Sequence, residues 1–224
     1  MTAHLVTGAG SGIGRVVAER LLERGDDVWL LARSAERAHD LREDHPGATV
    51  LVADLSFPES VESLELPDSL DSVVHAAGIV ELGPLSDLSV EDWASQLRVN
   101  LVSPATLTRV ALPALRAARG TVVFVNSGAG LNAHPGWSAY AASKFGLRAL
   151  ADSLRAEELE QGVRVTSVFP GRTATPMQVK VHAQEGKEYD ADDWIDPATV
   201  ADAIIGVLDL GDDATITDLS VRPR

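Results

Sequence analysis

The sequence predicts an α/β fold: a single domain with a doubly wound parallel sheet of about seven strands and helices on both faces. Short apolar and β-branched runs alternate with longer segments of helical periodicity along the 224 residues. The strand-like runs are continuously apolar, as in parallel strands that are covered on both faces. Repeated strand–helix–strand units with right-handed crossovers build such a sheet.

The strands are predicted from the short apolar runs, in chain order. They cover residues 4–7, 28–32, 49–53, 72–76, 121–126, 164–169 and 214–219. The last run follows a turn formed by Gly211, Asp212 and Asp213. No repeat, low-complexity segment or Ser/Gly-rich linker interrupts the alternation, which is why one domain is expected.

The helices are predicted from the segments between the strands. They cover residues 12–24, 35–43, 86–118, 137–160 and 197–210. The longest contains Pro104, which has no N–H and crowds the carbonyl of the residue four positions earlier, Asn100. That main-chain carbonyl therefore lacks a helical partner and is free to hold a water. A simple proline kink is the alternative.

Composition excludes several classes of function. The net charge of −14 argues against non-specific binding of nucleic acid or an anionic membrane, because both need a cationic surface. The absence of cysteine excludes disulfides, thiolate catalysis and Cys-ligated zinc, and the six histidines show no metal-ligand spacing. The sequence begins without a secretory signal pattern and has no apolar stretch of membrane-spanning length. We expect a soluble, cytoplasmic protein without a metal.

A glycine-rich turn follows the first predicted strand and opens the first helix. It reads Thr7-Gly8-Ala9-Gly10-Ser11-Gly12-Ile13-Gly14. N–H groups at a helix N-terminus attract phosphate, and glycines let a pyrophosphate approach closely. The spacing is not G-x-G-x-x-G but Thr-Gly-x-x-x-Gly-x-Gly. The turn predicts dinucleotide binding on a Rossmann-type sheet, with a ligand-free glycine turn as the alternative.

The tip of the second strand bears on the choice of nicotinamide cofactor. It reads Ala32-Arg33-Ser34, with no carboxylate to accept hydrogen bonds from a ribose. The Arg33 guanidinium can bind a 2′-phosphate and the Ser34 hydroxyl can donate to it, so NADP(H) is favoured over NAD(H). The alternative is that Arg33 is a solvated charge at a helix start.

Further predicted contacts lie at the carboxyl ends of later strands, where open α/β sheets bind ligands. Asp54 and Leu55 follow the third strand. The fourth strand is followed by the segment His75-Ala76-Ala77-Gly78. Each segment taken alone is equally compatible with an ordinary loop.

An acid–base pair is predicted near the start of the fourth helix. Tyr140 and Lys144 are four residues apart and therefore share a helix face. A nearby ammonium favours phenolate and lowers the pKa of a phenol, which suits proton exchange with a hydroxyl or carbonyl oxygen. Ser127 ends the fifth strand at the same edge, where its hydroxyl can bind a substrate oxygen. A surface Tyr–Lys pair is the alternative.

Together these motifs resemble the short-chain dehydrogenase/reductase family in its classical form, from Thr7 to about Met177. The family's Thr-Gly-x-x-x-Gly-Ile-Gly motif is matched in full, whereas His75 and Ala76 replace two asparagines of its Asn-Asn-Ala-Gly segment. The second asparagine usually steadies the central sheet, so that support must come from elsewhere. The family's catalytic Asn–Ser–Tyr–Lys tetrad corresponds to residues Asn100, Ser127, Tyr140 and Lys144.

The resemblance implies hydride transfer between nicotinamide and a carbonyl or alcohol, with residues 1–126 mainly binding cofactor and 127–224 providing catalysis and a substrate lid. Tyr140 would exchange the proton, Ser127 would hold the substrate oxygen, Lys144 would bind the ribose hydroxyls, and Asn100 would hold a relay water. The segment after the sixth strand adds cofactor contacts. The implied contacts there are Pro170, Gly171, Thr173 and Thr175.

Substrate choice is expected to depend on residues 128–137 and on 177–194, a short polar segment predicted to form a mobile lid. His134 and His182 are interpreted as loop histidines. The expected partner is a small carbonyl or alcohol, and the apolar surface of the long helices predicts a homodimer or homotetramer. Two alternatives remain. One is a 3-oxoacyl-(carrier protein) reductase, which would need an arginine patch such as Arg148, Arg155 and Arg172. The other is a non-catalytic nucleotide sensor.

Overall fold

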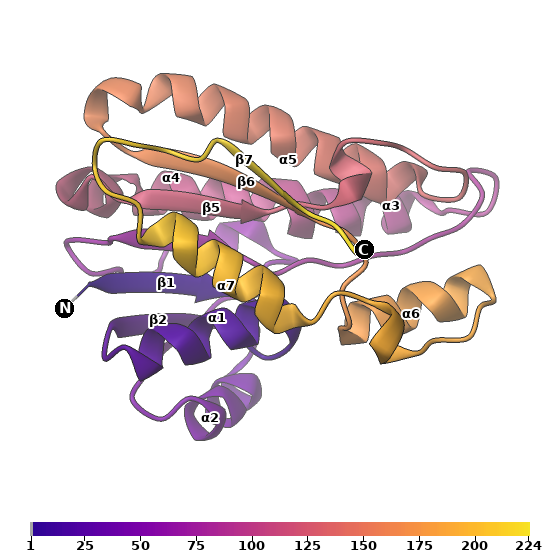
Figure 1. Cartoon of the computed structure of the whole chain (residues 1–224), viewed down its shortest axis with the longest axis horizontal. Coiled ribbons are helices and arrows are strands. Elements are labelled where there is room, and N and C mark those ends of the chain that lie inside the picture. The colour runs from indigo at the N-terminus through magenta and orange to yellow at the C-terminus, as the bar shows by residue number, and fades with distance from the viewer. Residues whose placement is uncertain (1) are drawn as a thin grey trace.

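The computed structural model describes residues 2–224 as a three-layer α/β structure (Figure 1). The strands form one sheet in the order β3-β2-β1-β4-β5-β6-β7, and all neighbouring strands run parallel. This confirms the predicted Rossmann-type doubly wound sheet. The strands are β1 (Ala3–Thr7), β2 (Asp27–Ala32), β3 (Thr49–Val52), β4 (Ser72–His75), β5 (Thr121–Val125), β6 (Arg164–Pro170) and β7 (Asp218–Val221).

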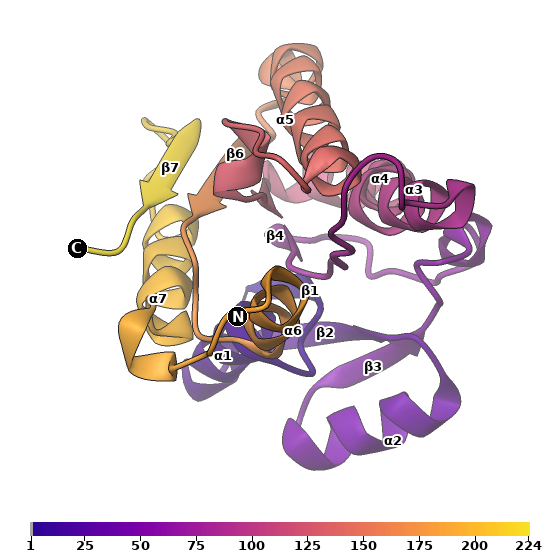
Figure 2. The same ribbon diagram turned by 90° about the vertical axis from the view of Figure 1, so that its right-hand side faces the viewer.

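Helices cover both faces of the sheet. They are α1 (Gly12–Glu23), α2 (Ala35–Asp44), α3 (Val90–Leu97), α4 (Ser103–Ala118), α5 (Ser138–Glu157), α6 (Pro176–Glu185) and α7 (Pro197–Leu208). One apolar core lies between the sheet and α1, α2 and α7, and a second lies between the sheet and α4 and α5. Figure 2 shows these two layers on opposite sides of the sheet, with α6 lying in front of its strand ends.

The central strands are buried along their whole length. All five residues of β5 and all four of β4 are buried, with Phe124 fully enclosed. Continuous burial explains why these strands read as unbroken apolar runs, because helices pack on both faces of the sheet. In β4 and β5 the polar side chains are therefore confined to the strand ends.

The prediction of one helix over residues 86–118 is wrong. Ser89 caps α3 through a reciprocal capping box with Asp92, so the helix starts at Val90. A π-helical turn, Arg98–Val102, then separates α3 from α4, and the Ser103 N–H donates to the carbonyl of Arg98. The extra residue in this turn precedes Pro104, which has no N–H to continue an α-helical pattern.

The last strand and the lid segment also differ from prediction. Pairing of β7 with β6 begins at Asp218, so the predicted strand 214–219 starts too early: its first four residues form no strand. The segment 177–194 contains a helix, α6, which no predicted element covers. Thr175 caps it, Pro176 occupies its first turn, and Gly186 ends it at φ +67°. All other predicted boundaries lie within three residues of those observed.

Within residues 2–224, no helix combines the length and hydropathy that crossing a bilayer requires.

Candidate active site

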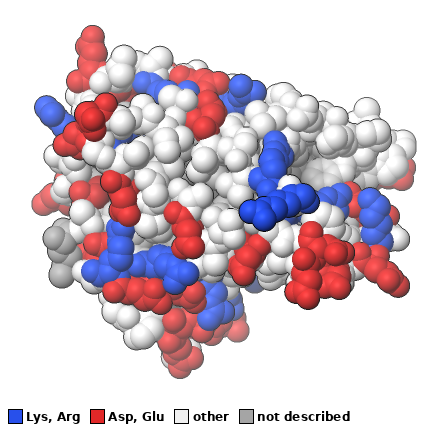
Figure 3. Space-filling model, viewed as in Figure 1, with Lys and Arg blue, Asp and Glu red and all other residues white. Residues whose placement is uncertain are grey.

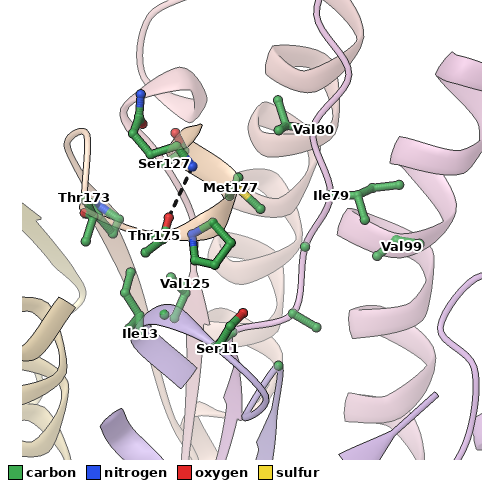
Figure 4. A pocket seen from close by; sticks show the side chains of 18 of the residues that line it. Ser11, Ile13, Ile79, Val80, Val99, Val125, Ser127, Thr173, Thr175 and Met177 are labelled. Carbon is green, nitrogen blue, oxygen red and sulfur yellow. Dashed lines mark hydrogen bonds between the residues drawn. The ribbon is translucent and has the colours of Figure 1, made fainter. Parts of the chain in front are cut away.

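A cleft at the carboxyl ends of the strands gathers most of the predicted site residues. It is a cavity of about 1160 Å³ bounded by the glycine turn, the loops after β3, β4 and β5, and the segment after β6. Figure 4 shows Ser11 and Ile13 from the glycine turn with Ile79 from the loop after β4 and Thr175 from the segment after β6. The winding of the sheet reverses here, since β1 lies between β2 and β4. Of the predicted residues, only Gly14, Ser34 and Asn100 do not line the cleft.

The glycine turn has the geometry that a phosphate requires. Gly8 has a φ of +75°, and a Cβ there would lie 2.7 Å from the amide nitrogen of Ala77. A Cβ on Gly12, at φ +56°, would lie 2.9 Å from the Thr175 Cγ2. The side chain of Ser11, the residue before α1, does not cap the helix. The first N–H groups of α1 therefore lack a side-chain acceptor, which leaves them available to an anion.

Gly14 lies behind the turn, outside the cleft, contrary to its prediction as a cofactor contact. A Cβ at this position would lie 2.6 Å from the carbonyl oxygen of Gly8. Gly14 therefore allows α1 to pack closely against the turn.

Two arginines line the far end of the cleft, beyond the tip of β2. Arg33 is exposed, and Arg37 follows it by four residues, on the first turn of α2. The Arg37 Nη1 donates to Asp40 at 2.6 Å, while its Nη2 would lie 3.1 Å from a Cβ on Gly10. Ser34 does not line the cleft: its hydroxyl caps α2 by accepting from the Arg37 N–H at 3.2 Å. The cap uses a lone pair of this hydroxyl and leaves its O–H free to donate, so the donation from Ser34 to a cofactor phosphate stays a prediction.

The loops after β3 and β4 line the cleft from the side of α4. The Asp54 carboxylate accepts from the Ser56 N–H at 2.8 Å, and the Leu55 carbonyl accepts from the Ser103 hydroxyl at 2.6 Å. Asp54 and Leu55 are thus held in place by their own loop and by α4.

The structure supplies the support that the replaced asparagine leaves missing. The Ala77 N–H donates to the Thr7 hydroxyl at 3.1 Å, which joins β1 to the loop after β4. The His75 Nε2 lies 2.9 Å from the Thr108 hydroxyl of α4, and its ring stacks on Phe124 at 5.0 Å. Burial lowers the pKa of His75 to about 3, so this imidazole is neutral and structural.

Tyr140, Ser127 and Lys144 meet at the floor of the cleft. The Ser127 hydroxyl is hydrogen-bonded to the Tyr140 phenol, and the Lys144 Nζ lies 5.9 Å from the Tyr140 ring centroid. Burial raises the pKa of Tyr140, and the bond to Ser127 lowers it by less. Lys144 is not among the groups that shift the pKa of Tyr140 here, and its Nζ donates to the Val125 carbonyl at 3.0 Å. Burial also lowers the pKa of Lys144 itself, to about 8.

Asn100 lies beneath the cleft, on the π-helical turn. Its side-chain oxygen accepts from the Ile79 N–H at 2.9 Å, and its amide donates to the Ile79 carbonyl at 2.9 Å and to the Ser143 hydroxyl at 3.0 Å. Ser143 in turn donates to the Tyr140 carbonyl at 2.7 Å. The side chain of Asn100 thus links the loop after β4 to the backbone of α5, which leaves only its main-chain carbonyl for a water.

Asn126 joins the two elements that position the reacting groups. Its side-chain oxygen accepts from the Ser127 N–H at 2.9 Å, and its amide donates to the Lys144 carbonyl at 3.1 Å. A Cβ on Gly130 would lie 2.3 Å from the Asn126 side-chain oxygen, so only glycine leaves room for this contact. Asn126 fixes the end of β5 against α5.

The segment after β6 and α6 roof the cleft. Arg172 forms a two-pronged ion pair with Glu185 at 2.6 and 2.8 Å, and its guanidinium lies 5.4 Å from the Trp194 ring centroid. On the other side, Lys180 donates to Glu81 at 2.6 Å. The predicted lid therefore contains a helix that is held by ion pairs at both flanks.

The two histidines of the predicted substrate segments differ. His134 lies in a loop and lines the cleft, as expected. His182 is not a loop residue: it is buried in α6, where it lies 2.9 Å from the Gln178 side chain and its ring contacts those of Tyr189 and Trp194. It is part of the packing of the roof.

Arg37, Asn126 and Arg222 are given a part in the site by the structure and are not among the predicted site residues. Arg37 could have been predicted from the sequence, because it follows Arg33 by four residues at the start of a helix, and this spacing places the two side chains on the same side of that helix start. For Asn126 the sequence gives weaker evidence, which is that a polar residue follows an apolar strand. Arg222 lines the cleft only because β7 brings the end of the chain there, and no local pattern predicts it.

Comparison with known proteins then assigns the chain to a family. A family model described as short chain dehydrogenase matches residues 2–186. The chain belongs to the short-chain dehydrogenase/reductase family. A short-chain type dehydrogenase/reductase of Sinorhizobium fredii is 33% identical to it, over 98% of this chain and 90% of the relative. The resemblance noted in the sequence is thereby confirmed.

Solved structures of this family have the same fold. The chain is similar to an alcohol dehydrogenase from the archaeon Thermococcus sibiricus complexed with 5-hydroxy-NADP, with a TM-score of 0.85 and 27% identity over 100% of this chain and 97% of that one. It is also similar to an actinorhodin polyketide ketoreductase with NADPH, with a TM-score of 0.86 and 27% identity over 99% and 96%. This short-chain dehydrogenase/reductase is an oxidoreductase of CH–OH/C=O groups.

Proposed function

We propose that the chain is an NADP(H)-dependent oxidoreductase that interconverts a carbonyl compound and a secondary alcohol, with Tyr140 as the acid–base group. The observation that carries this proposal is the convergence of Ser127, Tyr140 and Lys144 on the floor of the cleft. When bound, the nicotinamide supplies or accepts the hydride. The solved relatives that are described with NADP(H) support the same class of cofactor.

Tyr140 gives a proton to the substrate oxygen in reduction and removes it in oxidation. Burial raises the pKa of this phenol, so it holds its proton at neutral pH and is ready to act as the acid. The Ser127 hydroxyl, already bonded to the phenol, holds the same substrate oxygen. With NADP(H) as cofactor, reduction is the proposed cellular direction.

Lys144 and Asn100 serve the proton and the cofactor. The Lys144 Nζ uses one donor on the Val125 carbonyl, which leaves two for ribose hydroxyls. A Cβ on Gly78 would lie 3.3 Å from the Asn100 side-chain oxygen and 3.8 Å from the Lys144 Nζ, so the absent side chain keeps space between them. We assign to the Asn100 carbonyl, which Pro104 deprives of a helical N–H, the water that resupplies the proton.

The preference for NADP(H) rests on two guanidinium groups at the tip of β2. Arg33 has no carboxylate within ion-pair distance among residues 2–224, and Arg37 shares the same side of the cleft. Together they favour a 2′-phosphate over a bare ribose hydroxyl, for which the strand tip offers no carboxylate. The remaining predicted contacts, from Gly8 to Thr175, bind the rest of the cofactor.

Neither alternative function is favoured. A reductase of carrier-bound substrates would need free arginines, yet Arg148 and Arg155 pair with Asp152, and Arg172 pairs with Glu185. A nucleotide sensor would not need the buried hydrogen bonds that fix the positions of Asn100 and Ser127 relative to Tyr140.

We further propose a homodimer or homotetramer, expected from the apolar surface of the long helices. Phe145 of α5 is 42% exposed and Val102, next to α4, is 44% exposed. Light scattering after size-exclusion chromatography tests this, and a monomer at micromolar concentration would contradict it.

The test of the proposed function uses the only two tyrosines of the chain. A panel of ketones, aldehydes and secondary alcohols is assayed by NADPH and NADH absorbance with wild type, Tyr140→Phe and Tyr189→Phe. We expect Tyr140→Phe to lose about 10²- to 10⁴-fold in turnover while binding NADPH normally, and Tyr189→Phe to stay near wild type. Full activity in Tyr140→Phe would overturn the assignment of the acid–base group.

A further inference from the structure

The end of the chain crosses the substrate side of the cleft. The Gly171 N–H donates to the Val221 carbonyl at 2.7 Å, and a Cβ on Gly171 would lie 2.8 Å from Pro223. These contacts seat the segment after β7 on the loop after β6. They place Arg222 against the loop after β5, where a Cβ on Gly128 would lie 2.6 Å from its Nη1.

The Arg222 guanidinium therefore lies beside the residue that follows Ser127. Consecutive Cα atoms are about 3.8 Å apart, so the cation is within a few ångströms of the backbone that presents the Ser127 hydroxyl. Glycine at position 128 leaves room for the guanidinium in this position. Both residues line the cleft.

Arg222 differs from the other cations at this end of the cleft. Lys144 donates to the Val125 carbonyl, Arg172 is paired with Glu185 and Lys180 with Glu81. Within residues 2–224, Arg222 has no carboxylate within ion-pair distance. The sequence has 33 acidic residues against 19 Lys and Arg, and most arginines of the described chain are paired with them. Arg222 shares this lack of a carboxylate partner with Arg33, which lies at the other end of the cleft.

Figure 3 shows the same contrast on the molecular surface. Acidic side chains form scattered groups on this face, and one group of basic side chains lies near its centre, close to where Figure 1 places the C-terminus. The local potential at this end of the cleft therefore opposes the negative charge of the whole molecule, and it favours an anion over a cation.

We infer that Arg222 binds a carboxylate of the substrate, so that the substrate class is a short oxo or hydroxy acid. This inference rests on the proposed function. A guanidinium binds a carboxylate through two parallel hydrogen bonds, which fixes orientation as well as position. With the carboxylate on Arg222 and the reacting oxygen on Ser127 and Tyr140, few carbon atoms separate the two groups. Arg222 is then a specificity-determining residue contributed by the last strand.

The test compares an acid with its neutral ester, in wild type, Arg222→Gln and the control Arg224→Gln. Arg224 is an exposed arginine two residues further on that does not line the cleft. The binding probes are racemic 3-hydroxybutanoate and its methyl ester, measured by calorimetry on NADPH-loaded protein, in which the hydroxy compound cannot be oxidised. We expect wild type and Arg224→Gln to prefer the acid, and Arg222→Gln to lose about 10- to 100-fold in affinity for the acid with less than threefold change for the ester.

Equal affinity of wild type for acid and ester overturns the inference, as does a loss in Arg222→Gln that is the same for both probes. The second result would mean that Arg222 only fastens the end of the chain to Gly128. Turnover of acetoacetate and methyl acetoacetate with NADPH is then measured on the same proteins. If the acid binds in a way that depends on Arg222 but neither compound is turned over, only the proposed function is overturned. If the ester is turned over and the acid is not preferred, only the inference about Arg222 is overturned.

Discussion

Replacing Lys144 by methionine tests whether burial of the Lys144 ammonium lowers the free energy of unfolding. Lys144 is 4% exposed, and its Nζ has one protein acceptor, the Val125 carbonyl at 3.0 Å. Methionine preserves most of the side-chain volume and removes the charge. Burial removes water from the charged ammonium. Wild type should therefore be least stable, compared with Lys144→Met, at the pH values where Lys144 is charged.

The magnitude follows from the pKa of Lys144, which burial lowers from 10.5 to about 8. Between these values the unfolded chain holds a proton that the folded chain has released, so the stability of wild type rises with pH. At about pH 7 both forms hold the proton and the full penalty applies. Moving from about pH 7 to pH 10 should therefore raise the unfolding free energy of wild type, relative to Lys144→Met, by about 2 to 3 kcal/mol.

The assay is urea unfolding of both proteins at intervals across this pH range, read as the difference in unfolding free energy. The difference cancels the titration of every other group that the two proteins share. Lys187→Met is the matched control, since its side chain is 61% exposed and its difference should change by less than about 0.5 kcal/mol. A pH-independent difference for Lys144→Met would refute the reasoning, because it would mean that folding does not change the protonation of Lys144.

Three further predictions concern the rest of the site. Gly14→Ala places a Cβ against a backbone carbonyl, so it should lower the free energy of unfolding by about 1 to 3 kcal/mol and weaken NADPH binding. Gly206→Ala, which has open space around it in α7, should raise the free energy of unfolding by about 0.5 to 1 kcal/mol. Thermal unfolding measures both effects, and equal effects would contradict the steric argument. Asn126→Ala should lower kcat at least tenfold and stability by about 1 to 3 kcal/mol, and an unchanged kcat would remove its positioning role. Arg33→Ala and Arg37→Ala should each raise the Kd of NADPH by about tenfold more than that of NADH, measured by nucleotide fluorescence, and equal weakening of both would exclude a phosphate contact.

The fold could be predicted because its signals are local. Continuous apolar runs identify buried parallel strands, and the glycine turn identifies the end of the first one, since only glycine accepts the φ of +75° at Gly8. The alignment of Ser127, Tyr140 and Lys144 was also predictable, because strand ends share one edge of the sheet and residues four apart share a helix face. The missed α6 had local signals too, in the cap Thr175 and the stop Gly186.

Other features depend on neighbours that are distant in the sequence. Lys144 was expected to lower the pKa of Tyr140, yet it donates to Val125, and burial by the surrounding elements raises that pKa. The partner of Lys144 and the burial of Tyr140 are both set by packing between distant segments, and the sequence does not encode those distances locally.

The sequence by itself therefore determined the sheet, the glycine turn and the residue types available for proton and hydride chemistry, since each depends on propensity and spacing along a few residues. Only the tertiary structure decided the ionisation states of those groups and which other side chains lie beside them. Burial of Tyr140 and Lys144 depends on elements from across the chain. The approach of Arg222 to Gly128 depends on the pairing of β7 with β6. Solvation and electrostatic energies are set by distances in space, and only the packed chain fixes those distances.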